Sequence, residues 1–351
     1  MTLPVRNLLI GDSESVELER NLWNDRYVPA VMRTNGQSAS VKVRYRGGHT
    51  RGYPKRSYEV VREGQSFHYN AEFDDPSMIR NALSFHFLPT IGVPSPRTKH
   101  VLLQRNGEPL GVYLEIEGVE RKFFRRRKIG YSSLFYAINN NADFGLRVPE
   151  TNRNKSSLLS GYEYRSGGSS EKSRLVSFIR GFNERNGSRL HNFLRMRLDT
   201  SNYLRWLGGA VLTGNYDGFE QNYAIYRHSK TGKYRIIPWD YEGTWGRNCY
   251  GRIVSSDLVD VKGYNYLTVK LLENPAMRRK YRSILSNAIK GPFTERALMP
   301  VVNGMLENIW PDLREDPYRR WTRAEFMGEA EVIRQYIRER RSIVSAAIRK
   351  M

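Results

Sequence analysis

The sequence predicts an α+β protein of two lobes, with a small strand-rich N-terminal lobe over residues 1–118 and a larger, mainly helical lobe over residues 119–351. A length of 351 residues exceeds one average domain and can bury a sizeable core. Apolar and polar residues alternate in the first third, as in strands, and apolar residues recur at helical intervals beyond residue 120. Because no long Pro-, Gly- or Ser-rich linker interrupts the chain, we expect it to be globular throughout.

The N-terminal lobe is expected to contain four strands, which cover residues 39–45, 57–61, 99–104 and 111–116. The last two form a hairpin, since Asn106-Gly107 favours a tight turn with positive φ. Residues 75–88 carry apolar side chains at helical intervals, and Asp75 before Pro76 is typical of a helix start. We therefore expect a helix from about residue 76.

In the C-terminal lobe, a helix capped near Asp199 or Thr200 runs into a turn at residues 215–218. A hairpin follows, with strands at 222–227 and 234–238, and it ends at Trp239-Asp240. The Gly- and Ser-rich residues 160–170 indicate an exposed loop. Further helices are expected near 264–290, 294–310 and 328–349.

Charge and cysteine content restrict the class of protein. No apolar stretch approaches the length of a bilayer, no signal peptide opens the chain, and Cys249 is the only cysteine, so we expect a cytoplasmic protein with no membrane association. A net charge of +21 favours an anionic partner, either nucleic acid, an acidic protein or an anionic ligand. The densest basic cluster, residues 121–128, fits a solvated helix face, and no nucleic-acid-binding motif accompanies it. Nucleic acid is therefore the minor hypothesis.

Three polar residues around the second hairpin suggest phosphoryl transfer. Asp217 and Asn222 lie five residues apart after a helix, and Asp240 ends the following hairpin. In protein kinases an Asp in such a loop accepts the proton of the substrate hydroxyl, while an Asn and a later Asp hold magnesium. Taken alone, Asn-Tyr-Asp-Gly is also an ordinary turn, and Asp240 is also consistent with a helix cap or an ion-pair partner.

A basic, glycine-containing turn between two strands, residues 46–58, has the composition of an anion-binding loop. Lys55 and Arg56 point to opposite faces, so only one of them should reach a bound phosphate. The alternative is an ordinary basic hairpin. The six histidines show no metal-ligand spacing, and the motifs of α/β-hydrolases, P-loop NTPases and dinucleotide enzymes are absent from the sequence.

The sequence resembles the CotH family of bacterial spore-coat protein kinases. The matching blocks lie at 28–32, 45–58, 70–81, 111–117 and, most specifically, 203–246, which includes Ile237-Pro-Trp-Asp-Tyr-Glu-Gly-Thr-Trp-Gly246. The resemblance implies a divergent, two-lobed protein-kinase-like fold that binds ATP with Mg²⁺ or Mn²⁺. It further implies phosphorylation of Ser-rich, basic spore coat proteins, at serine or alternatively threonine, in the mother-cell cytoplasm and then the spore coat.

The resemblance also implies roles for individual residues. Asp217 matches the catalytic acid, Asn222 and Asp240 match the metal ligands, and Lys55 matches the phosphate-pairing lysine, with Arg56 as its competitor. Two glutamates, Glu72 and Glu117, are alternative partners of that lysine, and two aromatics, Tyr136 and Trp245, are candidates for stacking on the base. The sequence departs from standard kinases because Asn215-Tyr216 replaces His-Arg before Asp217, and Trp239-Asp240-Tyr241 replaces Asp-Phe-Gly. A non-catalytic coat scaffold with a basic recruiting surface remains the alternative function.

Overall fold

The structure is a computed structural model that describes residues 2–351. The α+β class is confirmed, with strands concentrated in the N-terminal part and helices in the C-terminal part. The chain forms two compact units, each assembled from three segments. Unit 1 contains the described residues up to Leu83, Pro96–Arg127 and Pro300–Glu331, and unit 2 contains Ser84–Ser95, Lys128–Met299 and Val332–Met351.

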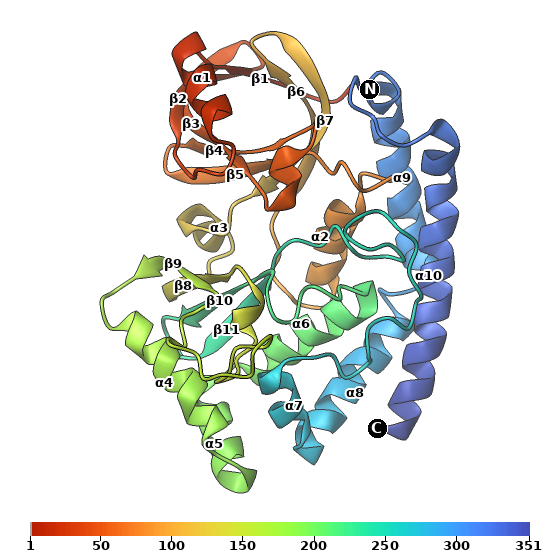
Figure 1. The fold of residues 1–351 in the computed structure, drawn as a ribbon. Helices are drawn as coiled ribbons and strands as arrows, with labels where there is room; N and C mark the ends of the chain where they lie inside the picture. The colour runs from red at the N-terminus through yellow and green to blue at the C-terminus, as the bar shows by residue number, and fades with distance from the viewer. Residues whose placement is uncertain (1) are drawn as a thin grey trace. The chain divides into compact units, whose positions relative to one another are not determined.

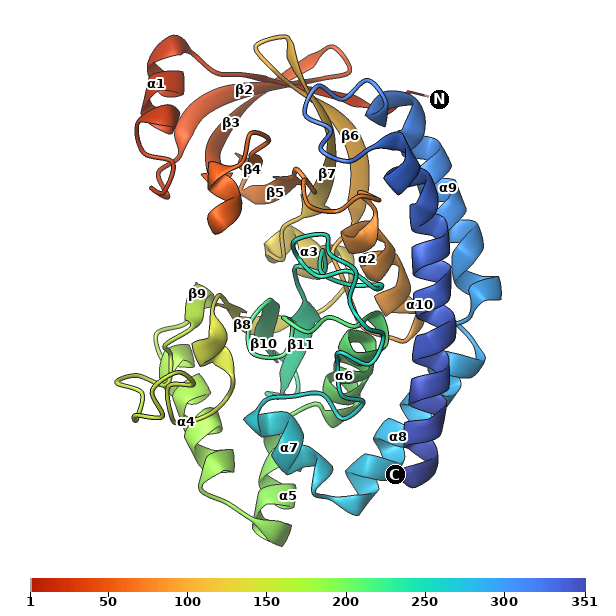
Figure 2. The ribbon, with the colours of Figure 1, turned by 45° about the vertical axis from the view of Figure 1, so that its right-hand side comes forward.

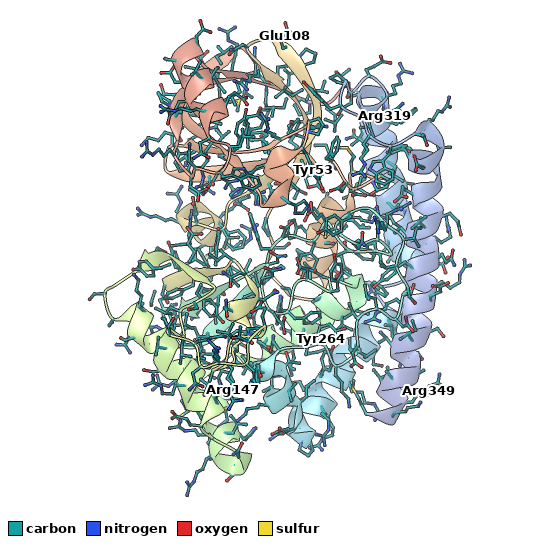
Figure 3. The ribbon with its side chains drawn as sticks, viewed as in Figure 1. Tyr53, Glu108, Arg147, Tyr264, Arg319 and Arg349 are labelled. Carbon is teal, nitrogen blue, oxygen red and sulfur yellow. The ribbon has the colours of Figure 1, made fainter. Side chains whose placement is uncertain are left out.

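Unit 1 is built on a closed barrel of seven strands (Figure 1). The strands are β1 (Val5–Leu9), β2 (Val28–Thr34), β3 (Gln37–Arg46), β4 (Ser57–Arg62), β5 (Gln65–Asn70), β6 (Thr98–Arg105) and β7 (Glu108–Glu117). They follow the order β1-β2-β3-β4-β5-β7-β6, and β6 closes on β1 in the one parallel pairing of the barrel. Side chains fill the interior (Figure 3), where Val43, Tyr45 and Val60 belong to one buried apolar cluster.

The four strands expected in the N-terminal lobe are confirmed as β3, β4, β6 and β7, each slightly longer than expected. Strands β1, β2 and β5 were not predicted. β6 and β7 form the expected hairpin, in which Asn106 and Gly107 adopt φ values of 54° and 90°. The register of β3 against β4 places Tyr45 opposite Tyr58, and their rings lie 5.2 Å apart between centroids. Short helical segments α1 (Asp12–Arg20), η1 (His49–Gly52) and α3 (Arg121–Arg126) complete this part of the chain.

The expected helix near residue 76 starts later than the sequence suggested. Helix α2 spans Arg80–Thr90. Met78 adopts a φ of 59°, which prevents a right-handed helix from passing through it. Asp75 still caps the first turn, because its carboxylate accepts hydrogen bonds from the backbone N–H groups of Ser77 at 2.9 Å and Arg80 at 3.0 Å.

Unit 2 contains a four-stranded antiparallel sheet of order β11-β10-β8-β9. Its strands are β8 (Tyr131–Ala137), β9 (Tyr162–Gly167), β10 (Tyr223–His228) and β11 (Tyr234–Pro238), and the short helix η2 (Asn140–Ala142) follows β8. The expectation of an exposed loop over residues 160–170 was wrong, because β9 lies there. Its aromatic residues explain the difference, since Tyr162 is buried and Tyr164 packs on Phe135 with centroids 5.4 Å apart.

Seven further helices follow, and Figure 2 shows α6 beside β10 and β11. They are α4 (Glu171–Asn183), α5 (Gly187–Arg197), α6 (Thr200–Thr213), α7 (Tyr266–Leu272), α8 (Pro275–Lys290), α9 (Glu295–Leu313) and α10 (Arg323–Lys350). The region expected to be helical near 264–290 is divided at Asn274, whose side chain caps α8. Within residues 2–351, no helix is both long and apolar enough to cross a membrane.

The units do not divide the chain at residue 118, where the sequence suggested a single boundary. Segment 300–331 folds with the N-terminal strands, because the carboxylate of Asp316 accepts hydrogen bonds from Lys55 and from the N–H of Val112. The indole of Trp321 also donates to the carbonyl of Phe73 at 3.2 Å. Local sequence patterns carry no signal for these contacts, which join residues more than 200 positions apart.

Candidate active site

The site of unit 2 is positioned by helix α6 and the β10–β11 hairpin. Asp199 caps α6, and Gly214 ends it with a φ of 72°, a left-handed conformation that suits glycine. The next residue, Asn215, is buried and accepts the N–H of Gly218 at 3.3 Å, which closes the expected turn. Asp217 lies in this turn, between the end of the buried helix α6 and the start of β10.

The carboxylate of Asp217 is held by two amide side chains. Asn222 donates from Nδ2 to one oxygen at 2.9 Å, and Gln221 donates from Nε2 to the other at 2.6 Å. Burial raises the pKa of the Asp217 carboxyl, and the two hydrogen bonds act in the opposite direction. A carboxylate that is oriented in this way, and whose affinity for a proton is raised, has the properties of a general base.

Asn222 and Asp240 lie at the open end of the hairpin. The carbonyl of Asn222 accepts the N–H of Trp239 at 3.1 Å, and the amide of Asn215 approaches the carbonyl of Asp240 at 3.5 Å. Asn222 and Asp240 adopt φ values of 58° and 55°. Asn and Asp tolerate left-handed backbone better than most residues. The bonds of Asn222 to Asp217 and to the N–H of Trp239 bring Asp217, Asn222 and Asp240 to the same end of the hairpin.

Several neighbours of this group were not predicted. Tyr216 hydrogen-bonds to the thiol of Cys249 at 3.0 Å. Burial raises the pKa of that thiol, as do the negative charges of Glu242, Asp217 and Asp240. Cys249 has no local motif in the sequence, and Gln221, which lies between the predicted turn at 215–218 and the strand from 222, was not assigned a role.

A second acidic group adjoins the same loop. Burial raises the pKa of Glu220, with further contributions from the negative charges of Asp143 and Asp217, and Lys155 acts in the opposite direction. Lys155 is itself engaged, because it pairs with Asp143 at 2.5 Å and donates to the carbonyls of Asn141 and Gly145. Negative charge thus predominates around Asp217.

The residues at the hairpin end have donor atoms that suit a hard divalent cation. The amide oxygen of Asn222 and the carboxylate of Asp240 are ligands of the type that Mg²⁺ prefers, and Mg²⁺ in phosphoryl-transfer sites takes one or two carboxylates and completes its shell with phosphate and water. Across residues 2–351, no group of three or more His, Cys, Asp or Glu side chains is arranged to hold a metal ion. Asn222 and Asp240 are thus the side chains at this end of the hairpin whose donor atoms fit Mg²⁺.

The two aromatic residues expected to contact a base lie in different surroundings. Tyr136, on β8, is partly exposed and stacks on Trp239 with centroids 5.8 Å apart, and the guanidinium of Arg165 lies 5.2 Å from its centroid. Trp245 is fully buried, with its ring against Phe293 and its indole N–H bonded to Ser84 at 2.8 Å. Because its ring has no exposed face, Trp245 acts in the core of unit 2, and we do not retain it as a nucleotide contact.

Lys55 and Arg56 belong to unit 1 and point in opposite directions, as the sequence suggested. Lys55 is buried, pairs with Asp316 at 2.6 Å and donates to the carbonyl of Val112 at 2.7 Å. Burial lowers the pKa of Lys55, and the charge of Asp316 opposes that effect. Arg56 instead pairs with Glu19 at 2.8 Å at the surface.

The carboxylate paired with Lys55 is neither of the two expected glutamates. Glu72 accepts hydrogen bonds from the amide of Asn81, and Glu117 pairs with Arg126 and Arg127. Asp316 forms the ion pair, and the negative charge of Glu72 also raises the pKa of Lys55. Nothing in the local sequence of Asp316 indicated its role. Whether Lys55 also meets a phosphate stays a prediction.

The chain is similar to known proteins over nearly its whole length. It is 35% identical over 345 residues to inner spore coat protein H of Bacillus subtilis (strain 168), covering 96% of this chain and 95% of that protein. It is 26% identical over 306 residues to the inner spore coat protein H-like protein of the same organism, covering 85% and 87%. Among solved structures, the Helicobacter pylori proinflammatory kinase CtkA matches with a TM-score of 0.40 and 10% identity, over 84% of this chain and 94% of that one. The family described as CotH kinase protein matches residues 43–344, and the chain therefore belongs to the CotH kinase family.

Proposed function

We propose that the protein is an ATP-dependent protein kinase that phosphorylates serine side chains, with threonine as the alternative acceptor, in Ser-rich basic segments of spore coat proteins. One observation carries the proposal. The carboxylate of Asp217, whose pKa burial raises, is oriented by Asn222 beside the end of a hairpin that carries Asp240. Membership of the CotH kinase family and the names of the two Bacillus relatives support the substrate class.

Each residue has a separate task in this proposal. Asp217 accepts the proton of the acceptor hydroxyl, and Gln221 and Asn222 hold its oxygens in place for that transfer. Asn222 and Asp240 supply the oxygen ligands for Mg²⁺ or Mn²⁺, which when bound with ATP neutralises the charge of the phosphates. Tyr136 is retained as a candidate contact of the base, and Lys55 as the candidate partner of a phosphate.

The decisive experiment separates chemistry from nucleotide binding. The purified chain is incubated with labelled ATP, Mg²⁺ or Mn²⁺ and a Ser-rich basic coat protein, and transferred phosphate is counted. We expect Asp217→Asn to lower transfer by about 10²–10⁴-fold and to leave ATP affinity nearly unchanged, because a positioned base acts on the chemical step. Asp257→Asn is the matched control, since Asp257 is an exposed carboxylate of the same unit that accepts a hydrogen bond from the hydroxyl of Ser255.

Asp240→Asn should act through the metal instead. Thermal stability is measured with ATP alone, metal alone and both together. Wild type should gain stability chiefly with both, by mass action, and Asp240→Asn should lose most of that gain. Full transfer by Asp217→Asn, or an unchanged metal-dependent shift in Asp240→Asn, contradicts the assigned roles.

We also propose that this activity takes place in the mother-cell cytoplasm and then in the spore coat, and the names of the Bacillus relatives support the second of these locations. If the chain binds Ser-rich coat proteins but transfers phosphate to none of them, the result would favour a non-catalytic coat scaffold that recruits its partners through the net charge of +21.

A further inference from the structure

Unit 2 contains a cavity of about 460 Å³ that the proposed phosphoryl transfer does not use. It lies among α4, α5 and the β10–β11 hairpin, elements that can be followed in Figure 2. Its volume lies within the range of about 300–1,000 Å³ typical of small-ligand sites. Three arginines line it, Arg174 on α4, Arg197 at the end of α5 and Arg227 on β10, together with Ser177, Thr231 and Tyr234.

Positive charge in this cavity exceeds negative charge. Glu171 holds Arg227 through two hydrogen bonds, at 2.8 and 2.5 Å, and lies 3.5 Å from Arg174. Within the described residues, Arg197 makes neither a hydrogen bond nor an ion pair. One carboxylate thus faces three guanidinium groups, and Arg197 remains available to an anion.

A buried hydroxyl without a partner provides a second, independent observation. Tyr234 is 2% exposed, and its ring lies 4.7 Å from that of Phe178 between centroids. Its hydroxyl makes no hydrogen bond within the part of the chain that the structure describes. Buried tyrosine hydroxyls usually have a partner, since leaving one unsatisfied costs free energy. Burial raises the pKa of Tyr234, as does the negative charge of Glu171, and the charges of Arg227, Arg174 and Arg197 act in the opposite direction.

We propose that this cavity binds a phosphorylated serine side chain presented by a peptide. Guanidinium groups pair with phosphate oxygens in a planar, two-pronged geometry, and two excess positive charges match a phosphate dianion. Tyr234 gives the phosphate a further donor. The assignment of phosphoserine as the source of the anion rests on the proposed function, because the product of that reaction is a phosphorylated Ser-rich segment. Such a segment would stay bound at the cavity while another of its serines is presented to Asp217.

Binding is tested with the full chain in the Asp217→Asn form and without ATP, so that catalysis plays no part. The probes are a Ser-rich basic peptide with one phosphoserine, the same peptide unphosphorylated, the same peptide with glutamate at that position, and inorganic phosphate. Titrations are followed by fluorescence anisotropy of the labelled peptides at about 0.15 M salt, where long-range attraction is screened. We expect the phosphopeptide to bind at least about tenfold more tightly than the unphosphorylated peptide, as charge-assisted bonds to arginine imply.

Three variants assign the effect to the cavity. Arg197→Ala should remove most of the preference for phosphoserine, and Tyr234→Phe should reduce it by about threefold without destabilising the free protein, since it deletes an unsatisfied hydroxyl. Arg195→Ala is the control, because Arg195 is an exposed residue of the same helix that does not line the cavity.

Equal affinity for phosphorylated and unphosphorylated peptides overturns the proposal, as does an equal loss in Arg195→Ala. If the glutamate peptide binds as tightly as the phosphopeptide, the cavity is a general site for acidic peptides. If inorganic phosphate displaces the phosphopeptide completely at a concentration near the Kd of that peptide, the cavity is a site for free phosphate. Either result also overturns it. If the wild-type chain transfers no phosphate to coat proteins but the cavity still binds the phosphopeptide, the proposed function is contradicted and the binding site is not.

Discussion

The buried ion pair of unit 1 permits a quantitative test of what stabilises that unit. The side chains of Lys55 and Asp316 are 3% and 0% exposed, and Nζ lies 2.6 Å from Oδ2. Asp316→Asn removes the negative charge but retains an oxygen acceptor of the same shape. The ammonium then keeps the carbonyl of Val112, the ring of Tyr113 and the nearby charge of Glu72 but loses its paired carboxylate. Breaking one side of a buried pair costs about 3–5 kcal/mol, and we expect the free energy of unfolding to fall by this amount.

A double variant separates the cost of an orphaned charge from the loss of packing. Lys55→Met combined with Asp316→Asn removes both charges. The N–H groups of Val112 and Tyr318 bond to different oxygens of Asp316, and the amide keeps one oxygen, so one of these bonds is lost in the single and the double variant alike. Replacing a whole buried pair by neutral groups is often nearly neutral. The double variant should therefore be at least about 2 kcal/mol more stable than Asp316→Asn alone.

The assay is urea unfolding of the full chain, followed by circular dichroism and by tryptophan fluorescence. Trp310 and Trp321 lie in unit 1 and report on its transition. Lys122→Met is the control, since Lys122 pairs with Glu63 at 3.4 Å in the same unit with both side chains substantially exposed, and such pairs contribute less than about 1 kcal/mol. The reasoning is refuted if Asp316→Asn costs no more than Lys122→Met, or if the double variant is no more stable than the single one.

Three further predictions concern stability and reactivity. Burial raises the pKa of Asp217, so ionisation of this carboxyl favours the unfolded chain. Asp217→Asn should have the stability of wild type below the ordinary Asp pKa of 3.8 and become more stable than wild type as the pH rises from there through the folded pKa. Parallel plots of the free energy of unfolding in urea against pH for the two proteins would contradict this. Gly111→Ala should destabilise unit 1 by more than about 2 kcal/mol, because Gly111 has a φ of 95° and an added Cβ would overlap the carboxylate of Asp316; Gly107→Ala, with a similar φ but open space, is the control in the same unfolding assay. Since the pKa of the Cys249 thiol is raised, its rate of reaction with a disulfide reagent at neutral pH should be below that of a free thiol and should increase steeply only in alkaline solution, and a fast reaction at pH 7 would rule out this environment.

Local patterns predicted much of the fold and of the site in unit 2. The strands of the β6–β7 hairpin and its Asn106-Gly107 turn depend on residues next to one another. Asp217, Asn222 and Asp240 could be grouped because they follow one helix and are separated only by one turn and one hairpin, and the structure brings them together. The backbone of this segment is set by contacts within about 40 consecutive residues, because a short hairpin pairs strands that are close in sequence.

Features that depend on distant segments could not be predicted in the same way. Asp316 pairs with Lys55 across 261 positions, and its neighbours in sequence resemble any exposed loop. Strand β9 was missed because the glycines and serines around it obscured Tyr162 and Tyr164, which pack on Tyr223 and Phe135 and hold the strand against the sheet. The arginine-lined cavity joins two helices to a hairpin, and periodicity says nothing about which helix faces which strand.

The left-handed backbone at the end of the β10–β11 hairpin limits what evolution can substitute there. Positions 222 and 240 accept asparagine, aspartate or glycine at low cost, whatever the protein does, because other side chains are strained at φ values near 58° and 55°. Asp217 is not among the positive-φ residues of the described chain, so its backbone imposes no such choice. If a relative had lost catalysis, Asn and Asp would persist at the first two positions as architecture, whereas position 217 would be free to drift. The residue found there in a relative is therefore the more informative sign of whether that relative is still an active enzyme.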